Sequence, residues 1–309
     1  MKQKIKEILS IVALPLSVYC IFFIIEPRRF GTLQTLYIMF QQAFIPSIVA
    51  WGLCFVMTLG LYDLSIGAII ILSSMIGTKV GLLFGPFFGL FGLIVSCVLI
   101  SVVLEYINAV AYTVLKIPSM IVTIGLLMIY ETIGNLIGGA SLPFEISMFG
   151  RAPYNIVTGI ITFLLAYFLF NKTQAGVQIK AVGGSELISE NAGINVQKVK
   201  ILGFLLCGLF TGIASFLTIS HGGLVMPSTR IESVTRLFPP LMGYFIGVAL
   251  SKICNIIIGI FIGEMVIVMI ITGMITMGVT TTLQQVITGL FLLAVVGVAK
   301  RGEIEEVVK

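Results

Sequence analysis

Acidic residues within long apolar stretches are the side chains in this sequence best suited to do chemistry. Asp63, Glu105, Glu131 and Glu264 lie in such stretches. An ionisable group at membrane depth is costly, and it usually marks a functional site. Glu105 and Glu131 lie close enough to the predicted span ends to reach water, whereas Glu264 lies deeper, in a cavity, at an interface or at a span end. We keep Asp63, Glu131 and Glu264 as candidate residues of a solute pathway.

Asp63 also lies in a break of the apolar pattern, the segment GLYDLSIGA from Gly60 to Ala68. Glycines flank it on both sides, and either Asp63 or Ser65 can cap the helix that follows. Broken helices are the places where membrane transporters expose backbone groups to a pathway. We therefore predict a functional break, with Asp63, Ser65 and Gly67 on the substrate pathway. A simple tight turn is the alternative.

The residues of enzymes and metal sites are mostly missing. The single histidine, His221, cannot build a histidine metal cluster or a histidine-dependent triad within this chain, and we expect it to be a solvated loop residue. The five cysteines show no paired or metal-like spacing. No GxxxxGK[ST] segment is present, so an ATPase would have to be another polypeptide. We predict no catalytic residue, no metal site and no cofactor in this chain.

The elements that position these residues follow from composition. Hydrophobic residues make up 58% of the 309 residues and charged residues only 10%, against roughly 25% charged in soluble domains. The apolar residues form continuous blocks, and a helical span needs about 20 of them. We predict an all-α integral membrane protein with about ten transmembrane helices in a single domain over 1–309. The predicted spans are Ile8–Ile25, Ile38–Leu59, Ile66–Gly77, Phe87–Tyr106, Ile121–Ile137, Ile156–Phe170, Ile201–Ile219, Leu237–Leu250, Ile256–Gly278 and Leu283–Ala299.

Charge predicts the orientation of these spans. Placing both termini in the cytoplasm puts most of the 18 lysines and arginines on the cytoplasmic side, as the positive-inside rule requires. The net charge of +5 then belongs to membrane topology, and we expect no nucleic-acid partner. Ile8–Ile25 follows three lysines, as in a secretory signal, but no cleavage site follows it, and we interpret it as a retained span.

The longest polar stretch, Asn171–Lys200, lies on the cytoplasmic side in this topology. We predict a turn at Gly183–Gly184, an N-cap at Ser185 and a short helix over Glu186–Ala192. Gly193 is typical of the residue that follows a helix C-cap. A helix this short is unstable alone, so we expect it to need a partner surface.

Three ordered segments give the chain a family resemblance. They are GLYDLSIG at Gly60–Gly67, KIPSMIVTIGLLMIYETIGNLIGG at Lys116–Gly139 and TQAGVQIKAVGGSELISENAGINVQKVKI at Thr173–Ile201. Together with LQQVITGLFLLAVVGVA at Leu283–Ala299, they cover most of the chain. The sequence resembles the permease subunits of ATP-binding-cassette (ABC) importers of the ribose, galactose and autoinducer-2 class.

The resemblance implies a mechanism and a set of partners. Two permease subunits form a pathway in the bacterial cell membrane, two cytoplasmic ATPases use ATP and Mg²⁺ to drive it, and an extracytoplasmic solute-binding protein delivers the solute. The segment that docks into the ATPase corresponds to Glu186–Ile194. We expect Leu187 and Ile194 to be apolar anchors and Glu186 a polar rim contact. The predicted coupling residues are Gly184, Glu186, Leu187, Ala192, Gly193 and Ile194.

One region departs from the family pattern. Where the family usually has Ala-Ala-Val-Val-Ile-Gly-Gly-Thr and a glycine-rich turn, this chain has RLFPPLMGYFIGVALSKICN at Arg236–Asn255. Pro227 is family-like, but the glutamate that normally follows it is present only as Glu232, at a displaced position. Loss of glycines changes how closely helices approach at an interface. We therefore expect a second, different permease subunit, and a homodimer is the alternative.

The leading hypothesis is a permease for a sugar or sugar-like solute, which leaves pentoses, hexoses, nucleosides and autoinducer-2-like furanoses open. The first alternative is a proton-coupled secondary carrier that uses Glu131 or Glu264. The second is an intramembrane enzyme or scaffold, which the lack of a nucleophile, base or metal constellation disfavours. An ABC permease is normally encoded beside an ATPase and a secreted binding protein, whereas a secondary carrier needs neither.

Overall fold

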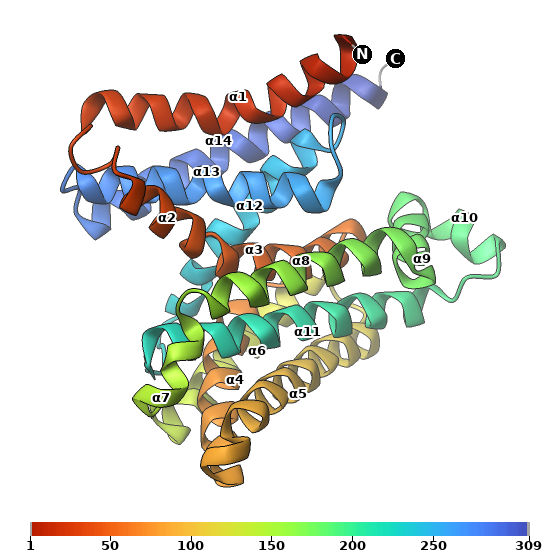
Figure 1. The fold of residues 1–309 in the computed structure, drawn as a ribbon. Coiled ribbons are helices and arrows are strands. Elements are labelled where there is room, and N and C mark those ends of the chain that lie inside the picture. The colour runs from red at the N-terminus through yellow and green to blue at the C-terminus, as the bar shows by residue number, and fades with distance from the viewer. Residues whose placement is uncertain (1, 308–309) are drawn as a thin grey trace. The chain divides into compact units, whose positions relative to one another are not determined.

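The computed structural model describes the backbone of residues 2–307 and the side chains of residues 12–83, 89–294 and 297. Figure 1 shows a fold made almost wholly of helices, with one antiparallel pair of two-residue strands, β1 (Ala140–Ser141) and β2 (Leu224–Val225). The helices are α1 (Lys2–Ile25), α2 (Leu33–Gln42), α3 (Phe44–Thr58), α4 (Ile66–Gly81), η1 (Leu82–Phe84), α5 (Gly85–Leu115), α6 (Ser119–Ile137), α7 (Phe144–Ser147), η2 (Met148–Gly150), α8 (Tyr154–Lys172), α9 (Gln174–Gly184), α10 (Glu186–Asn191), α11 (Val196–Gly222), η3 (Glu232–Leu237), α12 (Phe238–Leu250), α13 (Ile256–Thr276) and α14 (Thr281–Val307).

The helices confirm the predicted all-α membrane class. Among the described residues, seven helical segments are long and apolar enough to cross a bilayer by length and composition. Three shorter apolar helices, Val12–Ile25, Ile66–Gly81 and Thr281–Ala294, complete the predicted set. On α8 the exposed side chains before the terminal Lys172 are apolar or aromatic, whereas small residues such as Gly159 and Ala166 are buried. Apolar residues outside and small ones inside are typical of helices that pack in lipid.

The described residues cluster into two compact units. Unit 1 comprises Met1–Ala50 and Phe238–Lys309, and unit 2 comprises Trp51–Leu237. Unit 1 therefore contains both ends of the chain, and unit 2 is one continuous stretch. The assignment of one domain to residues 1–309 stays a prediction.

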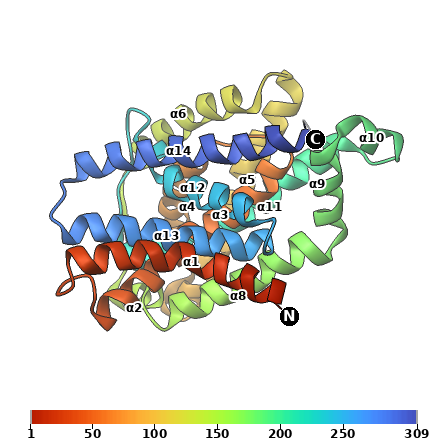
Figure 2. The same cartoon turned by 90° about the horizontal axis from the view of Figure 1, so that it is seen from above.

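In unit 1, α14, α12, α13 and α1 lie side by side in that order (Figure 2). Phe30, just before α2, and Met39 of α2 pack against Val268 and Met269 of α13. The Lys2 end of α1 and the Val307 end of α14 lie at the same end of this unit in both views, as termini on one side of the membrane require. That this side is the cytoplasm stays a prediction.

In unit 2, α4 packs against α5, α6 and α11, and α11 lies along α5 (Figure 1). Serines hold α4 to α11: the hydroxyl oxygens of Ser73 and Ser215 lie 2.7 Å apart, and Ser74 Oγ donates to the Ser215 carbonyl oxygen over 2.9 Å. Gly212 on α11 allows the backbone of α5 at Val98 to come so close that a Cβ would overlap it. Small and hydroxylated residues thus give this bundle its close helix contacts.

Candidate functional site

The predicted break is present between α3 and α4. Residues 61–65 are not helical, and Gly60 has a φ of +72°. Asp63 Oδ1 accepts hydrogen bonds from the backbone N–H and the hydroxyl of Ser65 over 2.8 and 2.7 Å. Ser65 is the N-cap of α4 by position, but its side chain makes no capping bond. The side chain that supports the start of α4 is therefore that of Asp63.

The break lies within the helical layer of unit 2. The N–H of Tyr62 donates to Ser119 Oγ over 2.9 Å, and the N–H of Leu64 donates to Thr123 Oγ1 over 3.1 Å, so the segment runs along the first turns of α6. Asp63 Oδ2 accepts from Asn108 Nδ2 over 3.1 Å. Asn108 precedes the end of α5 by about two turns, or roughly 10 Å. Asp63 thus contacts α5 within the length of that helix, and a break inside the membrane stays a prediction.

A buried polar cluster surrounds Asp63. Asn108 Nδ2 also contacts Ser65 Oγ at 2.7 Å and Glu105 Oε2 at 3.2 Å, and the Tyr130 hydroxyl donates to Asn108 Oδ1 over 2.9 Å. The expectation that Glu105 reaches water near a span end is wrong. Glu105 is 0% exposed because α5 continues to Leu115, beyond the predicted end at Tyr106. Sequence reasoning missed Asn108 and Tyr130, although Glu105 and Asn108 share one helix face by their i, i+3 spacing.

Charge in this cluster is unbalanced. Asp63 and Glu105 both contact the same amide nitrogen of Asn108, and none of the hydrogen bonds described for the cluster comes from a cationic group. Two ionised carboxylates this close, away from water, repel one another.

We expect Asp63→Ala to destabilise the non-helical segment between α3 and α4. The variant loses the bonds to Ser65, a cap of this kind being worth about 0.5–2 kcal/mol, and it leaves Asn108 without one acceptor. Asp63→Asn should be milder, because one oxygen still accepts from the Ser65 N–H. Thermal unfolding of the purified protein and solute uptake measure both effects.

Glu105→Gln is the control for this comparison, since it alters the same cluster without touching the cap, and we expect near-normal uptake. Should Asp63→Asn and Asp63→Ala transport equally badly while inserting normally, charge would be the requirement and the capping account wrong.

Glu131 and Gly67 meet at the η3 segment. Glu131 Oε2 accepts from the N–H of Ile231 over 2.9 Å, and Oε1 accepts from the N–H and hydroxyl of Ser233 over 3.0 and 2.6 Å. The Ser233 carbonyl oxygen lies so close to Gly67 that a Cβ there would overlap it. Glu131 and Gly67 thus allow this segment to pack against α6 and α4. That Asp63, Ser65, Gly67 and Glu131 line a pathway stays a prediction.

Glu264 lies in unit 1, on the face of α13 that packs against α12. It is 0% exposed, and within the described part of the chain neither carboxyl oxygen has a hydrogen-bond partner. A Cβ at Gly243 would overlap this carboxyl group. A charge in such a place is very costly. A role in the pathway stays a prediction.

The Arg236–Asn255 region contains two glycines that allow two helices to pack closely. Gly243 and Gly247 on α12 oppose Gly263 and Gly259 on α13 so closely that a Cβ on either helix would collide with its neighbour. These two glycines serve packing inside unit 1, and the expectation that the lost glycines change an interface with a second permease subunit stays a prediction. The spacing Gly-x-x-x-Gly in both helices was the missed signal.

The predicted coupling helix is present as α10. Ser185 Oγ accepts from the N–H of Ile188 over 3.4 Å, and Gly193, with a φ of +83°, follows the C-cap Ala192. Leu187 and Ile188 are 71% and 70% exposed. The predicted turn at Gly183–Gly184 is wrong, since both residues belong to α9. A Cβ at Gly183 would overlap the Thr58 carbonyl oxygen, so this glycine serves close packing.

A shallow groove of about 370 Å³ lies beside α10. Gly184, Ala192 and Ile194 line it, together with Ile188 of α10. Three of the six predicted coupling residues therefore share one surface. Ile194 is only partly exposed, so Leu187 and Ile188 are the more prominent apolar side chains.

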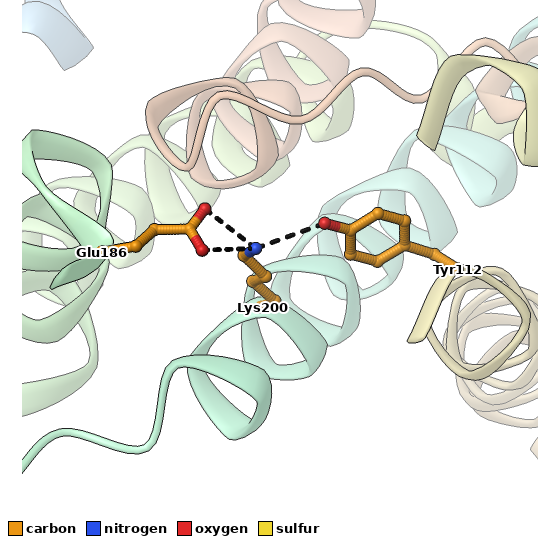
Figure 3. A network of polar contacts seen from close by, with 3 residues as sticks. All are labelled: Tyr112, Glu186 and Lys200. Carbon is orange, nitrogen blue, oxygen red and sulfur yellow. Dashed lines mark hydrogen bonds and ion pairs between the residues drawn. The ribbon is translucent and has the colours of Figure 1, made fainter. Parts of the chain in front are cut away.

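Lys200 ties α10 to α11 (Figure 3). Its ammonium lies 2.9 Å from a carboxylate oxygen of Glu186 and 3.2 Å from the Tyr112 hydroxyl. The pair is partly exposed, so it contributes little to stability in itself. It does orient the start of α10. Glu186, expected as a rim contact for a partner, is thus already engaged within the chain.

His221 is not a loop residue as expected, because α11 continues to Gly222. The ring of His221 is exposed, and its Nδ1 lies 3.1 Å from the Gly150 carbonyl oxygen. Gly150 allows this close approach, since a Cβ there would overlap the backbone of α11. The contact joins η2 to the end of α11.

Many apolar helices, a non-helical break between α3 and α4 and an exposed short helix define a polytopic membrane transport protein. Residues 35–296 match the family described as the permease component of the branched-chain amino acid transport system, and the chain belongs to this family. It is accordingly a permease component of a bacterial, binding-protein-dependent ABC import system and a multi-pass membrane subunit without catalytic activity of its own.

Several curated relatives align over most of the chain. The ribose import permease protein RbsC of Bacillus subtilis is 29% identical, over 88% of this chain and 86% of RbsC. The fructose import permease protein FrcC of Rhizobium meliloti is 27% identical, over 96% and 88%. The autoinducer 2 import system permease protein LsrC of Yersinia pseudotuberculosis is 24% identical, over 91% and 81%. No solved structure matches the chain.

Proposed function

We propose that this chain imports a sugar or sugar-like solute and that a separate cytoplasmic ATPase drives it through α10. The support for the solute class is that relatives carry the names of ribose, fructose and autoinducer 2 import permeases. An extracytoplasmic binding protein would deliver the solute. Co-purifying the chain with this protein and identifying the small molecule that it carries tests the solute class, and an amino acid there would overturn it.

The observation that carries the coupling role is the exposure of α10. A six-residue helix is too short to be stable alone, yet it presents Leu187 and Ile188 outward, 71% and 70% exposed. Exposed apolar side chains beside a groove are typical of a protein-binding surface. A docked ATPase would cover them, and closure of its nucleotide-bound dimer would then move α9 and α11.

The alternative, a proton-coupled carrier, has weaker support. The family consists of permease components of transport systems. Both carboxylate oxygens of Glu131 accept hydrogen bonds from the η3 segment, which gives this carboxylate a structural role. Glu264 is then the carboxyl group that such a carrier would have to use, because neither of its oxygens has a hydrogen-bond partner among the described residues.

Crosslinking tests the ATPase contact. We expect single cysteines at Leu187 and Ile188 to crosslink to the ATPase in a complex that hydrolyses ATP. Cys20, which is exposed, and Cys254, which is half-buried, must be replaced first, whereas the three buried cysteines are shielded.

A cysteine at Leu224 is the matched control, because this residue is 56% exposed but lies beyond the other end of α11. It should give no crosslink to the ATPase. Absence of a crosslink from both α10 positions in an active complex would remove the coupling assignment.

We also propose that the native importer contains a second, different permease chain. The support is the departure of the Arg236–Asn255 segment from the family pattern. Mass measurement of the intact complex should give two permease masses. An active importer with two copies of this chain would contradict the proposal.

A further inference from the structure

A second cavity lies in unit 2, apart from the groove beside α10. It has a volume of about 450 Å³, within the range of small-ligand sites. Its lining comes from the end of α5, the connection to α6 and the first two turns of α11. The lining residues are Tyr112, Thr113, Lys116, Ile117, Pro118, Gln197 and Lys200.

The chemistry of this lining favours an anion. Lys116 and Lys200 are cationic, and no acidic residue lines the cavity. Tyr112 and Gln197 add hydrogen-bond donors, whereas the Thr113 hydroxyl already donates to the Ala109 carbonyl oxygen over 2.7 Å. The cavity also lies at the N-terminal ends of α6 and α11, where the helix dipoles place partial positive charge.

The backbone at Lys116 gives an independent reason. Lys116 directly follows α5 and has a φ of +55°, and its N–H donates to the Tyr112 carbonyl oxygen over 3.1 Å. This left-handed conformation favours glycine, and Gly138 and Gly223 hold such a place after α6 and α11. A lysine in a strained position on the cavity wall is explained if its side chain is needed there.

We propose that this cavity binds the phosphate of an anionic phospholipid headgroup, with Lys116 and Lys200 as its cationic groups. Apolar side chains exposed on both sides of Lys116 favour a lipid over a soluble phosphate. Val114 and Leu115 are 69% and 57% exposed, and Ile121 on the first turn of α6 is 60% exposed. Basic pockets between membrane helices on the cytoplasmic side are typical sites for anionic headgroups.

The site is linked to α10 through one side chain. The ammonium of Lys200 that lines the cavity also contacts Glu186 and Tyr112 (Figure 3). An anion in the cavity and the Glu186 carboxylate would share this cation. The inference does not rest on the proposed coupling role, because lipid binding can be measured on the permease without its ATPase.

The test measures lipid retention by the purified full-length chain in native mass spectrometry. We expect the parent chain to retain phosphatidylglycerol over phosphatidylcholine of the same acyl chains. Lys116→Gln should weaken phosphatidylglycerol binding about fivefold, the effect of one lysine near a charged headgroup, and leave phosphatidylcholine binding unchanged. Lys198→Gln is the matched control, because Lys198 lies in the same turn of α11 as Lys200 but does not line the cavity.

Lys116→Gly separates binding from folding. It removes the charge and also relieves the left-handed strain, so we expect a higher unfolding temperature together with weaker phosphatidylglycerol retention. Added inorganic phosphate tests whether the ligand is a lipid or free phosphate. Displacement of phosphatidylglycerol would show that the phosphate group alone is recognised. Retention of phosphatidylglycerol would show that the rest of the lipid contributes to binding.

Two results would overturn the proposal. One is equal phosphatidylglycerol retention by the parent chain and both Lys116 variants. The other is unchanged lipid retention combined with weaker ATPase binding in Lys116→Gln, which would assign the cavity to an acidic side chain of the ATPase.

Discussion

Replacing Ala192 by arginine should abolish ATP-driven uptake while leaving membrane insertion intact. Ala192 is the exposed C-cap of α10, and it lines the groove of about 370 Å³ with Gly184 and Ile194. An arginine would fill this groove with a long charged side chain. A partner seated there would lose its apolar contact and bury an unpaired charge, which costs several kcal/mol. Uptake in reconstituted vesicles and co-purification of the ATPase measure the loss.

Asn191→Arg is the control for this experiment. Asn191 is the adjacent residue and is also exposed, but it does not line the groove. The same charge and bulk at this position should reduce uptake much less. Normal uptake by the Ala192 variant would mean that the groove receives no partner, and the coupling assignment would have to be abandoned.

Gly243→Ala should destabilise unit 1 strongly. The added methyl group would overlap the Glu264 carboxyl, which is buried against α12. Forcing extra atoms into a packed interface costs about 1–3 kcal/mol. We expect a lower unfolding temperature in detergent, whereas Gly125→Ala, at a glycine with open space around its Cβ position, should be neutral or slightly stabilising.

A double variant identifies the cause. Glu264→Ala removes the side chain that the new methyl group would meet, so Gly243→Ala should cost much less in that background. Such non-additivity is the signature of two residues in contact. Equal costs in both backgrounds would show that the overlap with Glu264 is not what requires glycine at position 243.

Local rules predicted the parts of this structure that local chemistry determines. The spans follow from composition, because a helix in lipid needs about 20 apolar residues wherever it occurs. The ends of α10 follow from Ser185 and Gly193, whose roles depend only on neighbouring backbone groups. The role of Asp63 is also local, because its carboxylate accepts from the backbone N–H of Ser65, two positions away.

The remaining features depend on residues far apart in the sequence. Asn108 meets Asp63 across 45 residues, and Ser233 meets Glu131 across 102. No local pattern indicates either pairing. At Gly183 a local pattern led to a wrong prediction. A pair of glycines is typical of a turn, but here α9 continues through both residues. Gly183 lacks a side chain because the Thr58 carbonyl oxygen lies against it.

Unit 1 is formed by two segments that lie on either side of unit 2 in the sequence, and this sets an order for its assembly during synthesis. The ribosome makes α1 and α2 before unit 2, whereas α13, against which they pack, is made after unit 2. All of unit 2 can insert and pack in the interval. The faces of Phe30 and Met39 that Val268 and Met269 later cover must meanwhile be shielded by lipid or by a membrane chaperone. We therefore expect closure of unit 1 to be a late step of synthesis, and a nascent chain arrested before α13 to hold its first helices without their partners.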